Sequence, residues 1–176
     1  MVIGGPRVHD DTIHLADYDE AWPRQYAEEA ARLRAALGPA AVGVEHVGST
    51  SVPGLAAKQV IDIVVVVADS SNEASYVPAF EAAGYVLRIR EPAWFEHRLF
   101  KGPGAAVNVH VFSAGCPEIA QMTAFRDHLR THPADRELYE RTKRELAARR
   151  WHYVENYANA KSDVVAEIMG RAVPGG

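Results

Sequence analysis

The chain has 176 residues, of which 48% are hydrophobic and 24% are charged, and it carries a net charge of −4 at pH 7. These values are typical of a folded protein with a sizeable core, and the acidic balance argues against nucleic acid as a partner. The single cysteine, Cys116, excludes an internal disulfide and suits a reducing compartment.

The first part of the chain predicts a mixture of strands and helices. Helices are expected from the cap Asp19 to Gly38-Pro39 and from the polar residues 69–72 to Gly84. Gly-Pro-Gly at 102–104 predicts a hairpin between the two strands that flank it. The strands are expected over residues 12–16, 41–47, 60–67, 85–90, 96–101 and 106–112.

The second part of the chain, from Pro117 onward, predicts helices near residues 118–131, 134–149 and 152–170. We therefore expect an α+β fold within one domain spanning residues 1–176. It combines a mixed sheet of about five strands flanked by helices, over residues 12–115, with a C-terminal extension of about three helices, over residues 116–172.

Asp62 lies inside the apolar run from Val60 to Val67. A run without polar alternation is typical of a strand that is covered on both faces, where an ionised carboxylate is costly unless a positive group or hydrogen bonds compensate. We therefore interpret Asp62 as a functional residue. The alternative is a structural aspartate that binds backbone amides near the start of the strand.

The turn Gly48-Ser49-Thr50-Ser51 precedes this strand, and Lys58 follows the turn. Glycine lets the backbone approach a ligand closely, and backbone amides, hydroxyls and one cation are the groups that bind a phosphate. The order of residues is not that of a Walker A loop. The turn is therefore either a phosphate-binding site or an ordinary Ser/Gly turn.

Two histidines are candidates for chemistry beside Asp62. Asn108 and His110 share one face of a predicted strand, which indicates a hydrated cleft where His110 is a general base or a metal ligand. His46 points inward just before the turn and is a further candidate metal ligand. The alternative for His110 is a structural histidine in a half-exposed sheet.

Four basic residues are candidates for binding substrate phosphates: Arg98, Arg126, Arg130 and Lys161. Arg126 and Arg130 lie one helical turn apart, and their alternative is surface pairing with Asp127 or Glu137. For Arg98 the alternative is a salt bridge to Glu96 or Glu91.

Residues 44–58 together with Ile61-Asp62-Ile63 closely resemble the GrpB family. Further segments match the same family: Tyr18-Asp19 with Trp22, residues 108–112, Phe125-Arg126-Asp127 with Arg130, His132-Pro133, and Tyr157 with Lys161. The resemblance therefore covers about residues 12–168. The family is similar to the nucleotidyltransferase-fold superfamily, whose signature is a Gly-Ser turn followed by an aspartate and a second acidic residue two positions later.

The resemblance implies a nucleotidyltransferase-like fold in which Gly48, Ser49 and Thr50 hold phosphates and Asp62 binds Mg²⁺. Twelve residues separate Ser49 from Asp62, but Val64 stands where the superfamily has its second carboxylate. His110 stands where a third carboxylate is expected. The loss of the second carboxylate argues against two-metal chemistry. Related domains also occur fused to dephospho-CoA kinase, which implies nucleotide or CoA metabolism.

Three functions follow as hypotheses. The first is a metal-assisted enzyme that transfers a nucleotidyl group from a nucleoside triphosphate to a small-molecule acceptor. The second is a non-catalytic nucleotide- or CoA-binding module, and the third is a single-metal hydrolase that uses Asp62, His46 and His110. Residues 1–11 lack an apolar signal core and no segment reaches about 18 apolar residues, so we expect a cytoplasmic protein with no membrane contact.

Overall fold

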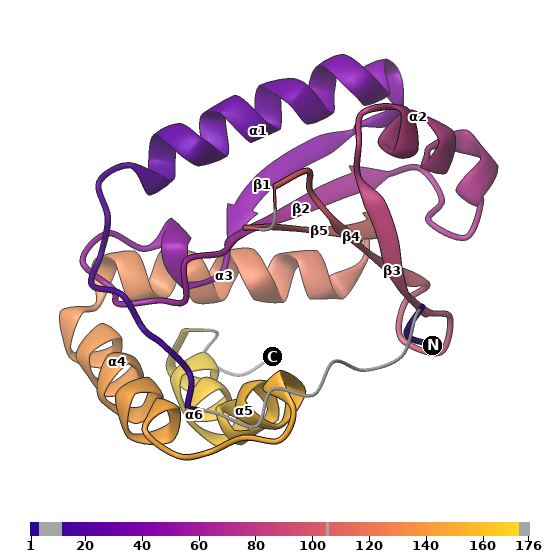
Figure 1. The fold of residues 1–176 in the computed structure, drawn as a ribbon. Coiled ribbons are helices and arrows are strands. Elements are labelled where there is room, and N and C mark those ends of the chain that lie inside the picture. The colour runs from indigo at the N-terminus through magenta and orange to yellow at the C-terminus, as the bar shows by residue number, and fades with distance from the viewer. Residues whose placement is uncertain (4–11, 105, 173–176) are drawn as a thin grey trace.

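A five-stranded mixed sheet forms the centre of the protein (Figure 1). The computed structural model describes residues 1–3, 12–104 and 106–172. The sheet has the order β1-β2-β5-β4-β3; β2 and β5 are parallel, and the other neighbouring strands are antiparallel. Its strands are β1 (Gly43–Val47), β2 (Ile61–Val67), β3 (Val86–Glu91), β4 (His97–Lys101) and β5 (Val107–Ser113).

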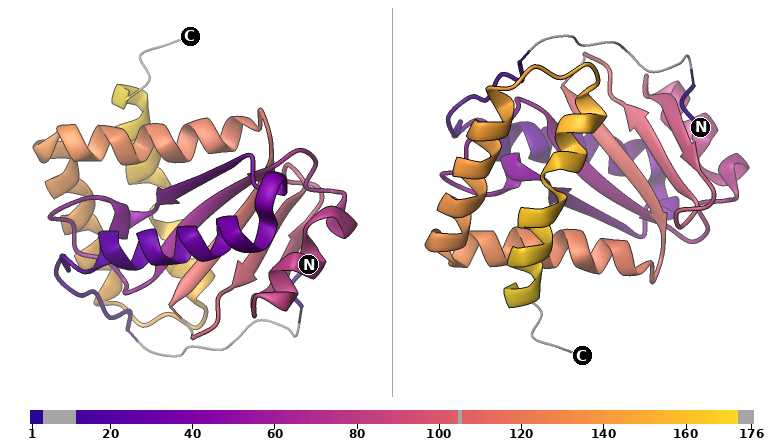
Figure 2. Two further views of the ribbon diagram at one scale, coloured as in Figure 1. Left: turned by 90° about the horizontal axis from the view of Figure 1, so that it is seen from above. Right: turned by 90° about the horizontal axis from the view of Figure 1, so that it is seen from below.

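Helices cover both faces of the sheet. The long helix α1 (Trp22–Leu37) and the short helix α2 (Val77–Ala82) lie on one face, and α3 (Pro117–Thr131) lies on the other (Figure 1). The view from below shows the remaining helices beside α3 on that second face (Figure 2). They are α4 (Pro133–Ala147), α5 (Val154–Ala160) and α6 (Ser162–Ala172), and single turns of 3₁₀ helix span Gly38–Ala40 (η1), Ser49–Ser51 (η2) and Glu73–Ser75 (η3).

The apolar run of β2 is buried on both faces, as its sequence predicts. Ile63 and Val65 point toward α1 and belong to the main core. Val64 points to the opposite face, toward α3, and packs with Val47 and Phe112. Asp62 shares the face of Val64 because side chains alternate along a strand. The carboxylate therefore points toward the helical half of the molecule.

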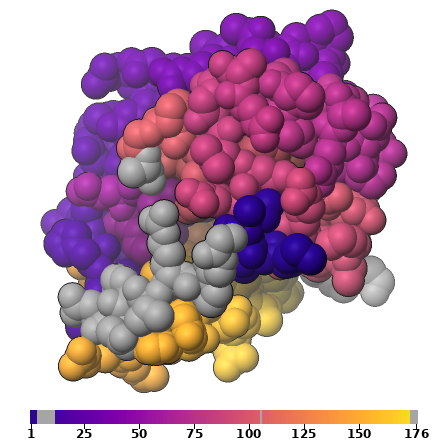
Figure 3. Space-filling view, turned by 45° about the vertical axis from the view of Figure 1, so that its right-hand side comes forward, coloured from indigo at the N-terminus to yellow at the C-terminus, as the bar shows by residue number. Residues whose placement is uncertain are grey.

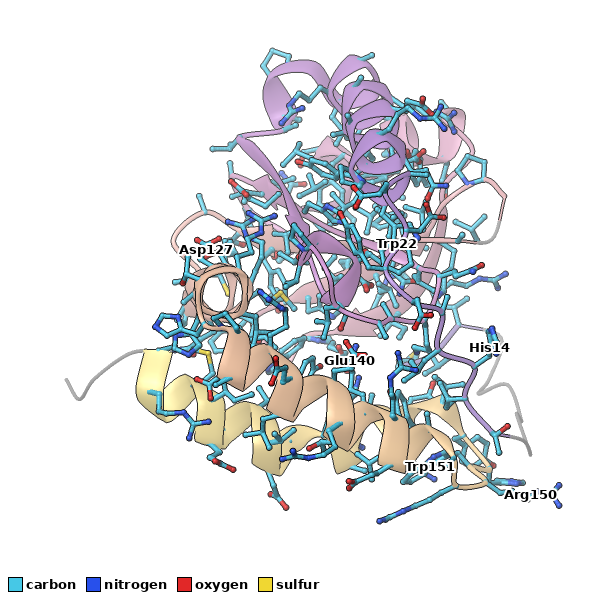
Figure 4. The ribbon with its side chains drawn as sticks, turned by 90° about the vertical axis from the view of Figure 1, so that its left-hand side faces the viewer. His14, Trp22, Asp127, Glu140, Arg150 and Trp151 are labelled. Atoms are coloured by element: carbon cyan, nitrogen blue, oxygen red, sulfur yellow. The ribbon has the colours of Figure 1, made fainter. Side chains whose placement is uncertain are left out.

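The loop that follows η2 packs against the C-terminal helices and so connects them to the sheet. Val52 and Leu55 are buried among Leu129, Tyr139, Val164 and Ile168. The amide of Ala56 donates a hydrogen bond of 3.0 Å to Glu140 Oε2. Figure 4 shows Glu140 on the side of α4 that faces the sheet half. These contacts fix the position of the loop relative to α4.

The N-terminal residues 1–3 extend the outer edge of the sheet. Val2 forms a bridge with Ile89, and the amide of Ile3 donates to the carbonyl of Arg88 at 2.7 Å. In the space-filling view, these indigo residues lie against the strand surface, above the orange and yellow C-terminal helices (Figure 3). Among residues 1–3, 12–104 and 106–172, no helix combines the length and the apolar character needed to cross a membrane.

The structure confirms the predicted α+β class with its mixed five-stranded sheet, and it corrects three elements. Residues 12–16 form only a bridge between Ala16 and Ala57, because the amide of Ile13 binds the carbonyl of Ala147 at the end of α4. The helix expected from residue 69 begins at Val77, since the Asp69 side chain accepts the amide of Ser71 in a local turn. The last predicted helix divides at Lys161 into α5 and α6.

The aromatic residues packed between α2 and the sheet allow a prediction about the stability of the protein. Phe100 is 0% exposed and stacks on Phe80 with ring centroids 4.2 Å apart. Phe100→Ala is expected to lower the free energy of unfolding by about 3–5 kcal/mol, because it removes the buried ring and leaves a cavity. Val42→Ala, at a side chain that is 62% exposed, is the control and is expected to change it by less than about 1 kcal/mol. Urea unfolding measures both, and equal losses would contradict this account of the core.

Candidate functional site

A pocket of about 190 Å³ lies between the sheet and the helices α3, α4 and α5. It is bounded by the turn after β1 and by the first residues of β2 and β5. Its polar lining therefore comes from segments that are far apart in the sequence: Gly48, Ser49, Thr50, Lys58, Asp62, Asn108, Arg126, Tyr139, Lys143, Tyr157 and Lys161.

Gly48 lies directly against the carboxylate of Asp62. Val47 pairs with Asp62 in the antiparallel register of β1 and β2, so the next residue passes over the aspartate side chain. Gly48 has a φ of +72°, and a Cβ at this position would be 2.8 Å from Asp62 Oδ2. Glycine is therefore required here both for the left-handed backbone and for the close approach.

The three hydroxyls of the turn have different roles. Ser51 Oγ donates to the carbonyl of Gly48 at 2.5 Å, and Thr50 Oγ1 donates to the carbonyl of Val60 at 3.1 Å. Both hydroxyls thus stabilise the turn itself. Ser49 Oγ instead accepts a hydrogen bond from Lys143 and belongs to the pocket lining. Among the described residues, the backbone amides of Ser49 and Thr50 find no acceptor.

Hydrogen bonds hold Asp62 in its ionised form. Asn108 Nδ2 donates to Asp62 Oδ1 at 2.9 Å, and His110 Nε2 lies 3.5 Å from the same oxygen. Burial by itself raises the pKa of Asp62, but the bonds from His110 and Asn108 and the charge of Lys58 outweigh it and lower the pKa. Lys101 donates to Asn108 Oδ1 and so orients the amide.

A chain of hydrogen bonds connects His110 to the protein surface. His97 Nδ1 binds Glu91 Oε2 at 2.7 Å, and His97 Nε2 lies 3.0 Å from His110 Nδ1. Burial and the neighbouring His110 lower the pKa of His97, so it is neutral, donates to Glu91 and accepts from His110. The chain of bonds therefore joins the His110 ring to Glu91, and the general base at His110 stays a prediction.

Three lysines line the pocket. Lys143 is 2% exposed and donates to Ser49 Oγ at 2.9 Å and to the carbonyl of Ala56. Burial and the charge of Lys161 lower the pKa of Lys143 to about 7, although Glu140 acts in the opposite direction. Burial and the charge of Lys58 lower the pKa of Lys161 to about 8. The pKa of Lys58 is also lowered, chiefly by burial. The site therefore concentrates mutually repelling cations.

The whole sequence contains four lysines and fifteen arginines. Three of the lysines line the pocket, and the fourth, Lys101, binds the Asn108 that orients Asp62. Arginines supply the surface ion pairs, such as Arg24 with Glu28 and Arg171 with Glu167. The concentration of lysine at one place is therefore not a consequence of a lysine-rich chain.

Tyr157 lines the same pocket and has a buried, unpaired hydroxyl. Its side chain is 1% exposed, and its Oη is the buried side-chain polar atom that has no hydrogen-bond partner in the part of the chain the structure describes. Lys58 Nζ and Lys161 Nζ lie 5.7 and 4.6 Å from the centre of its ring. A buried donor without a partner costs about 1–3 kcal/mol.

Two residues that the sequence predicts as part of the site, His46 and Arg98, lie on the face of the sheet opposite to Asp62. His46 faces α1, where its ring stacks on Tyr26 at 4.5 Å, while Asp62 faces α3. A metal site that combines His46 with Asp62 is therefore not formed. Arg98 is buried on the α1 and α2 side, where it binds Glu73 Oε1 at 2.6 Å and Glu96 Oε2 at 3.1 Å, so its prediction as a substrate ligand is wrong and the predicted salt bridge to Glu96 is present.

The two arginines of α3 differ in position. Arg126 lines the pocket, where its Nη1 donates to Glu45 Oε2 at 2.8 Å and to the carbonyl of His46 at 2.9 Å. Arg130 donates from Nε and Nη2 to the carbonyl of Ser51, at 2.9 and 2.7 Å. Arg130 therefore stabilises the turn from outside the pocket, whereas the charge of Arg126 lies beside the pocket.

The prediction from sequence omitted Lys143, Tyr157, Asn108 and the Glu91–His97 pair as site residues. The scarcity of lysine was the available signal for Lys143, because each lysine of a lysine-poor chain is a candidate for a task that arginine cannot perform. Tyr157 is part of the family resemblance, whereas His97 carried no signal in the sequence. Their positions depend on how α5 and β4 pack.

The donor groups of the pocket fit one hard cation but not two. Asp62 offers a carboxylate oxygen, and a single Mg²⁺ takes one or two carboxylates together with waters and substrate phosphates. A second ion would need a carboxylate at position 64, where Val64 is 0% exposed. Within the described residues, no three His, Cys, Asp or Glu side chains form a metal-binding group.

Comparisons with known proteins identify relatives along almost the whole chain. The sequence model of the GrpB protein family matches residues 12–171. A UPF0157 protein of Halalkalibacterium halodurans is 54% identical over 172 residues, which cover 98% of this chain and 88% of the relative. The crystal structure of the conserved protein GrpB from Enterococcus faecalis superposes with a TM-score of 0.79 at 33% identity, covering 90% of this chain and 96% of that one.

A more distant relative is part of a larger protein. A dephospho-CoA kinase of Mycolicibacterium paratuberculosis is 29% identical over 186 residues, which cover 91% of this chain and 46% of the kinase sequence. This match agrees with the expected fusion of related domains to such kinases.

The contact between Gly48 and Asp62 can be tested with two glycine variants. Gly48→Ala is expected to destabilise the protein and displace Asp62, because it combines an unfavourable φ with a Cβ placed 2.8 Å from Oδ2. Gly115→Ala is the matched control, since Gly115 has a φ of +81° with no atom within 4 Å of the added Cβ. A positive φ is strained for alanine in both variants, and at Gly48 the ψ of −179° adds to this strain. Urea unfolding should show a larger loss for Gly48→Ala, and equal losses would contradict the steric role of Asp62.

The pocket lysines predict that stability rises with pH. In the unfolded chain both Lys143 and Lys161 keep their protons to about pH 10, whereas in the folded protein their pKa values are about 7 and about 8. Between pH 7 and 9 the unfolded state binds more protons, so the free energy of unfolding increases with pH, by at most about 1.4 kcal/mol per pH unit for each lysine.

Urea unfolding at pH 7, 8 and 9 measures this slope. Lys143→Met is expected to give a shallower slope than the native protein, because it removes one of the two titrating amines. Arg141→Met, at an exposed position on the same helix, is expected to keep the native slope. An unchanged slope in Lys143→Met would show that Lys143 is not deprotonated in this range.

Proposed function

Because the chain belongs to the GrpB family, we propose that it binds a nucleoside triphosphate in this pocket and transfers the nucleotidyl group to a small-molecule acceptor. The observation that carries the proposal is the convergence of Lys58, Lys143 and Lys161 on the Gly48–Ser49 turn beside Asp62. A cluster of cations around one carboxylate is complementary to a polyphosphate chain.

The groups around the turn supply what a phosphate chain needs. The free amides of Ser49 and Thr50 and the hydroxyl of Tyr157 are donors without acceptors among the described residues. The amines of Lys58 and Lys161 add point charges at the opposite wall. Each of these groups gains a partner when phosphate oxygens occupy the pocket, and the repulsion between the lysines is relieved at the same time.

Asp62 is the residue that would hold one Mg²⁺ in this proposal. When bound, the ion neutralises charge on the phosphates and polarises the phosphorus that is transferred. Asn108 keeps the carboxylate oriented by its bond to Oδ1 and leaves Oδ2 toward the Gly48 side. The His110 imidazole lies 3.5 Å from Asp62 Oδ1 and helps to keep Asp62 ionised.

A second candidate function is a nucleotide- or CoA-binding module without catalysis. The buried Val64 favours it, because this residue removes the carboxylate on which a two-metal reaction depends. The partial match to a dephospho-CoA kinase makes CoA a ligand to include in the test. A hydrolase built on Asp62, His46 and His110 is no longer a candidate, since His46 faces the opposite side of the sheet.

The test is the melting temperature of the protein with ATP, GTP, CTP, UTP or CoA, each with Mg²⁺ and with EDTA. A ligand at about 100 times its Kd adds roughly 2.7 kcal/mol to the free energy of unfolding. We expect one nucleotide to raise the melting temperature in Mg²⁺ and to lose most of this effect in EDTA. A shift that survives EDTA, or one with CoA alone, would support the binding module, and no shift with any ligand would contradict both.

Asp62→Asn tests the role of the carboxylate in the same assay. The variant is expected to lose the Mg²⁺-dependent part of the shift and to lower turnover by about 100-fold or more, because the neutral amide binds the ion poorly. Asp69→Asn changes an exposed carboxylate beyond the other end of β2 and is expected to behave as the native protein. Turnover is measured as pyrophosphate release, and native turnover in Asp62→Asn would contradict the assignment.

A further inference from the structure

Trp94 and Phe95 form an exposed aromatic pair in the turn between β3 and β4. Trp94 is 38% exposed and Phe95 is 46% exposed, and the centres of their rings lie 6.1 Å apart. In the part of the chain that the structure describes, no other Trp, Tyr or Phe side chain is exposed. Single exposed apolar residues are common, but two adjacent aromatic rings form a surface on which a planar ring can stack.

The backbone of this turn is strained. Phe95 and Glu96 have φ values of +52° and +53°, a region that bulky side chains rarely adopt. The buried Arg98 holds the turn by donating to the carbonyl of Glu96 at 2.9 Å and to its carboxylate at 3.1 Å. Strained backbone of this kind occurs mainly at binding and catalytic sites. Here the strain accompanies an exposed ring, so burial of the Phe95 side chain does not account for it.

The indole of Trp94 is held by two other rings on the α3 face of the sheet. Its centre lies 4.9 Å from that of His97 and 5.5 Å from that of Phe112, with interplanar angles of 74° and 78°. These are edge-to-face contacts, which fix the orientation of an aromatic side chain. A surface that is ordered before the ligand arrives loses little conformational entropy on binding.

The aromatic pair is continuous with the Asp62 site. His97, which contacts Trp94, lies 3.0 Å from His110 between ring nitrogens, and His110 Nε2 lies 3.5 Å from Asp62 Oδ1. Phe112 lies four residues along β5 from the position paired with Asp62, which is about 13 Å at the usual rise of a strand. A ribose and base attached to a phosphate at Asp62 extend over a distance of this order.

The pocket is too small to enclose a whole nucleotide. Its volume of about 190 Å³ lies below the roughly 300–1,000 Å³ of pockets that enclose small-molecule ligands. In the proposed function the lysines and the Gly48–Ser49 turn bind the phosphate chain. The ribose and the base then lie outside the pocket, where a base gains affinity by stacking its face on an aromatic side chain.

We propose that Trp94 and Phe95 form the stacking site for the base of the bound nucleotide, an inference that rests on the proposed function of the pocket. The α-phosphate lies near Asp62, and the nucleoside extends along β5 past His110 to the aromatic pair. Every base has a planar face, so the pair adds affinity without reading the edge of the base. Purines stack over a larger area than pyrimidines and are therefore the preferred bases.

The experiment compares ATP, GTP, CTP and UTP with inorganic triphosphate, which has the phosphate chain but no nucleoside. Isothermal titration calorimetry of the full chain in Mg²⁺ measures each Kd. The native protein is expected to bind ATP or GTP more tightly than inorganic triphosphate. Trp94→Ala is expected to weaken nucleotide binding by about 5- to 150-fold, the range for the loss of one stacked base, and to leave the Kd of inorganic triphosphate unchanged.

Three further variants separate stacking from an effect on folding. Trp94→Phe keeps a ring against His97 and is expected to retain most of the affinity for nucleotides. Phe95→Ala leaves the contacts of Trp94 in place and is expected to weaken the binding of nucleotides alone. Val86→Ala changes another apolar side chain of the surface, which is 48% exposed, and is expected to bind every ligand as the native protein does.

Failure of this inference is distinguishable from failure of the proposed function. If the native protein binds nucleotides no more tightly than inorganic triphosphate, or if Trp94→Ala and Phe95→Ala keep the native affinity for nucleotides, the base does not stack here and the inference is wrong, while the phosphate site stands. Equal weakening of nucleotides and inorganic triphosphate would also overturn it, because Trp94 would then act through the Asp62 site. If the native protein binds none of these ligands, the proposed function fails and the inference fails with it.

Discussion

The site depends on the contact between the Gly48 backbone and the Asp62 carboxylate. The antiparallel pairing of β1 and β2 sets Val47 beside Asp62, so the turn that follows must pass over the aspartate. A side chain at position 48 would collide with Oδ2, and the left-handed backbone sends Ser49 toward α4. The turn and the carboxylate therefore share one geometric constraint.

Charge is distributed unevenly in this acidic protein. Three of its four lysines line one pocket; burial lowers the pKa of each, and the charge of a neighbouring lysine lowers those of Lys143 and Lys161 further. The cost of this arrangement is a lower stability near neutral pH, where the folded lysines must either lose protons or face each other charged. Selection for stability alone would not gather these side chains. Together with the unpaired Tyr157 hydroxyl, they support the proposed binding of an anion in this pocket.

The sheet divides polar residues into two groups with separate roles. On the α1 face, His46 bonds Thr50 and the buried Arg98 bonds Glu73, and these pairs hold elements together. On the α3 face, Asp62, Asn108 and His110 lie side by side because β2 and β5 are parallel and in register, with Asp62 opposite Asn108. The connection through His97 to Glu91 continues from this second face to the surface.

Local signals in the sequence determined much of the front half: the strands, the Gly-Ser turn, the buried run around Asp62 and the shared face of Asn108 and His110. These follow from alternation and turn chemistry, which act between neighbouring residues. Which face of the sheet a residue meets was decided only by tertiary structure. His46 and Arg98 alternate correctly along their strands but face α1 and α2, and Lys143 and Tyr157 reach the turn through the packing of α4 and α5. Strand order and helix docking arise from long-range burial, which no local pattern encodes.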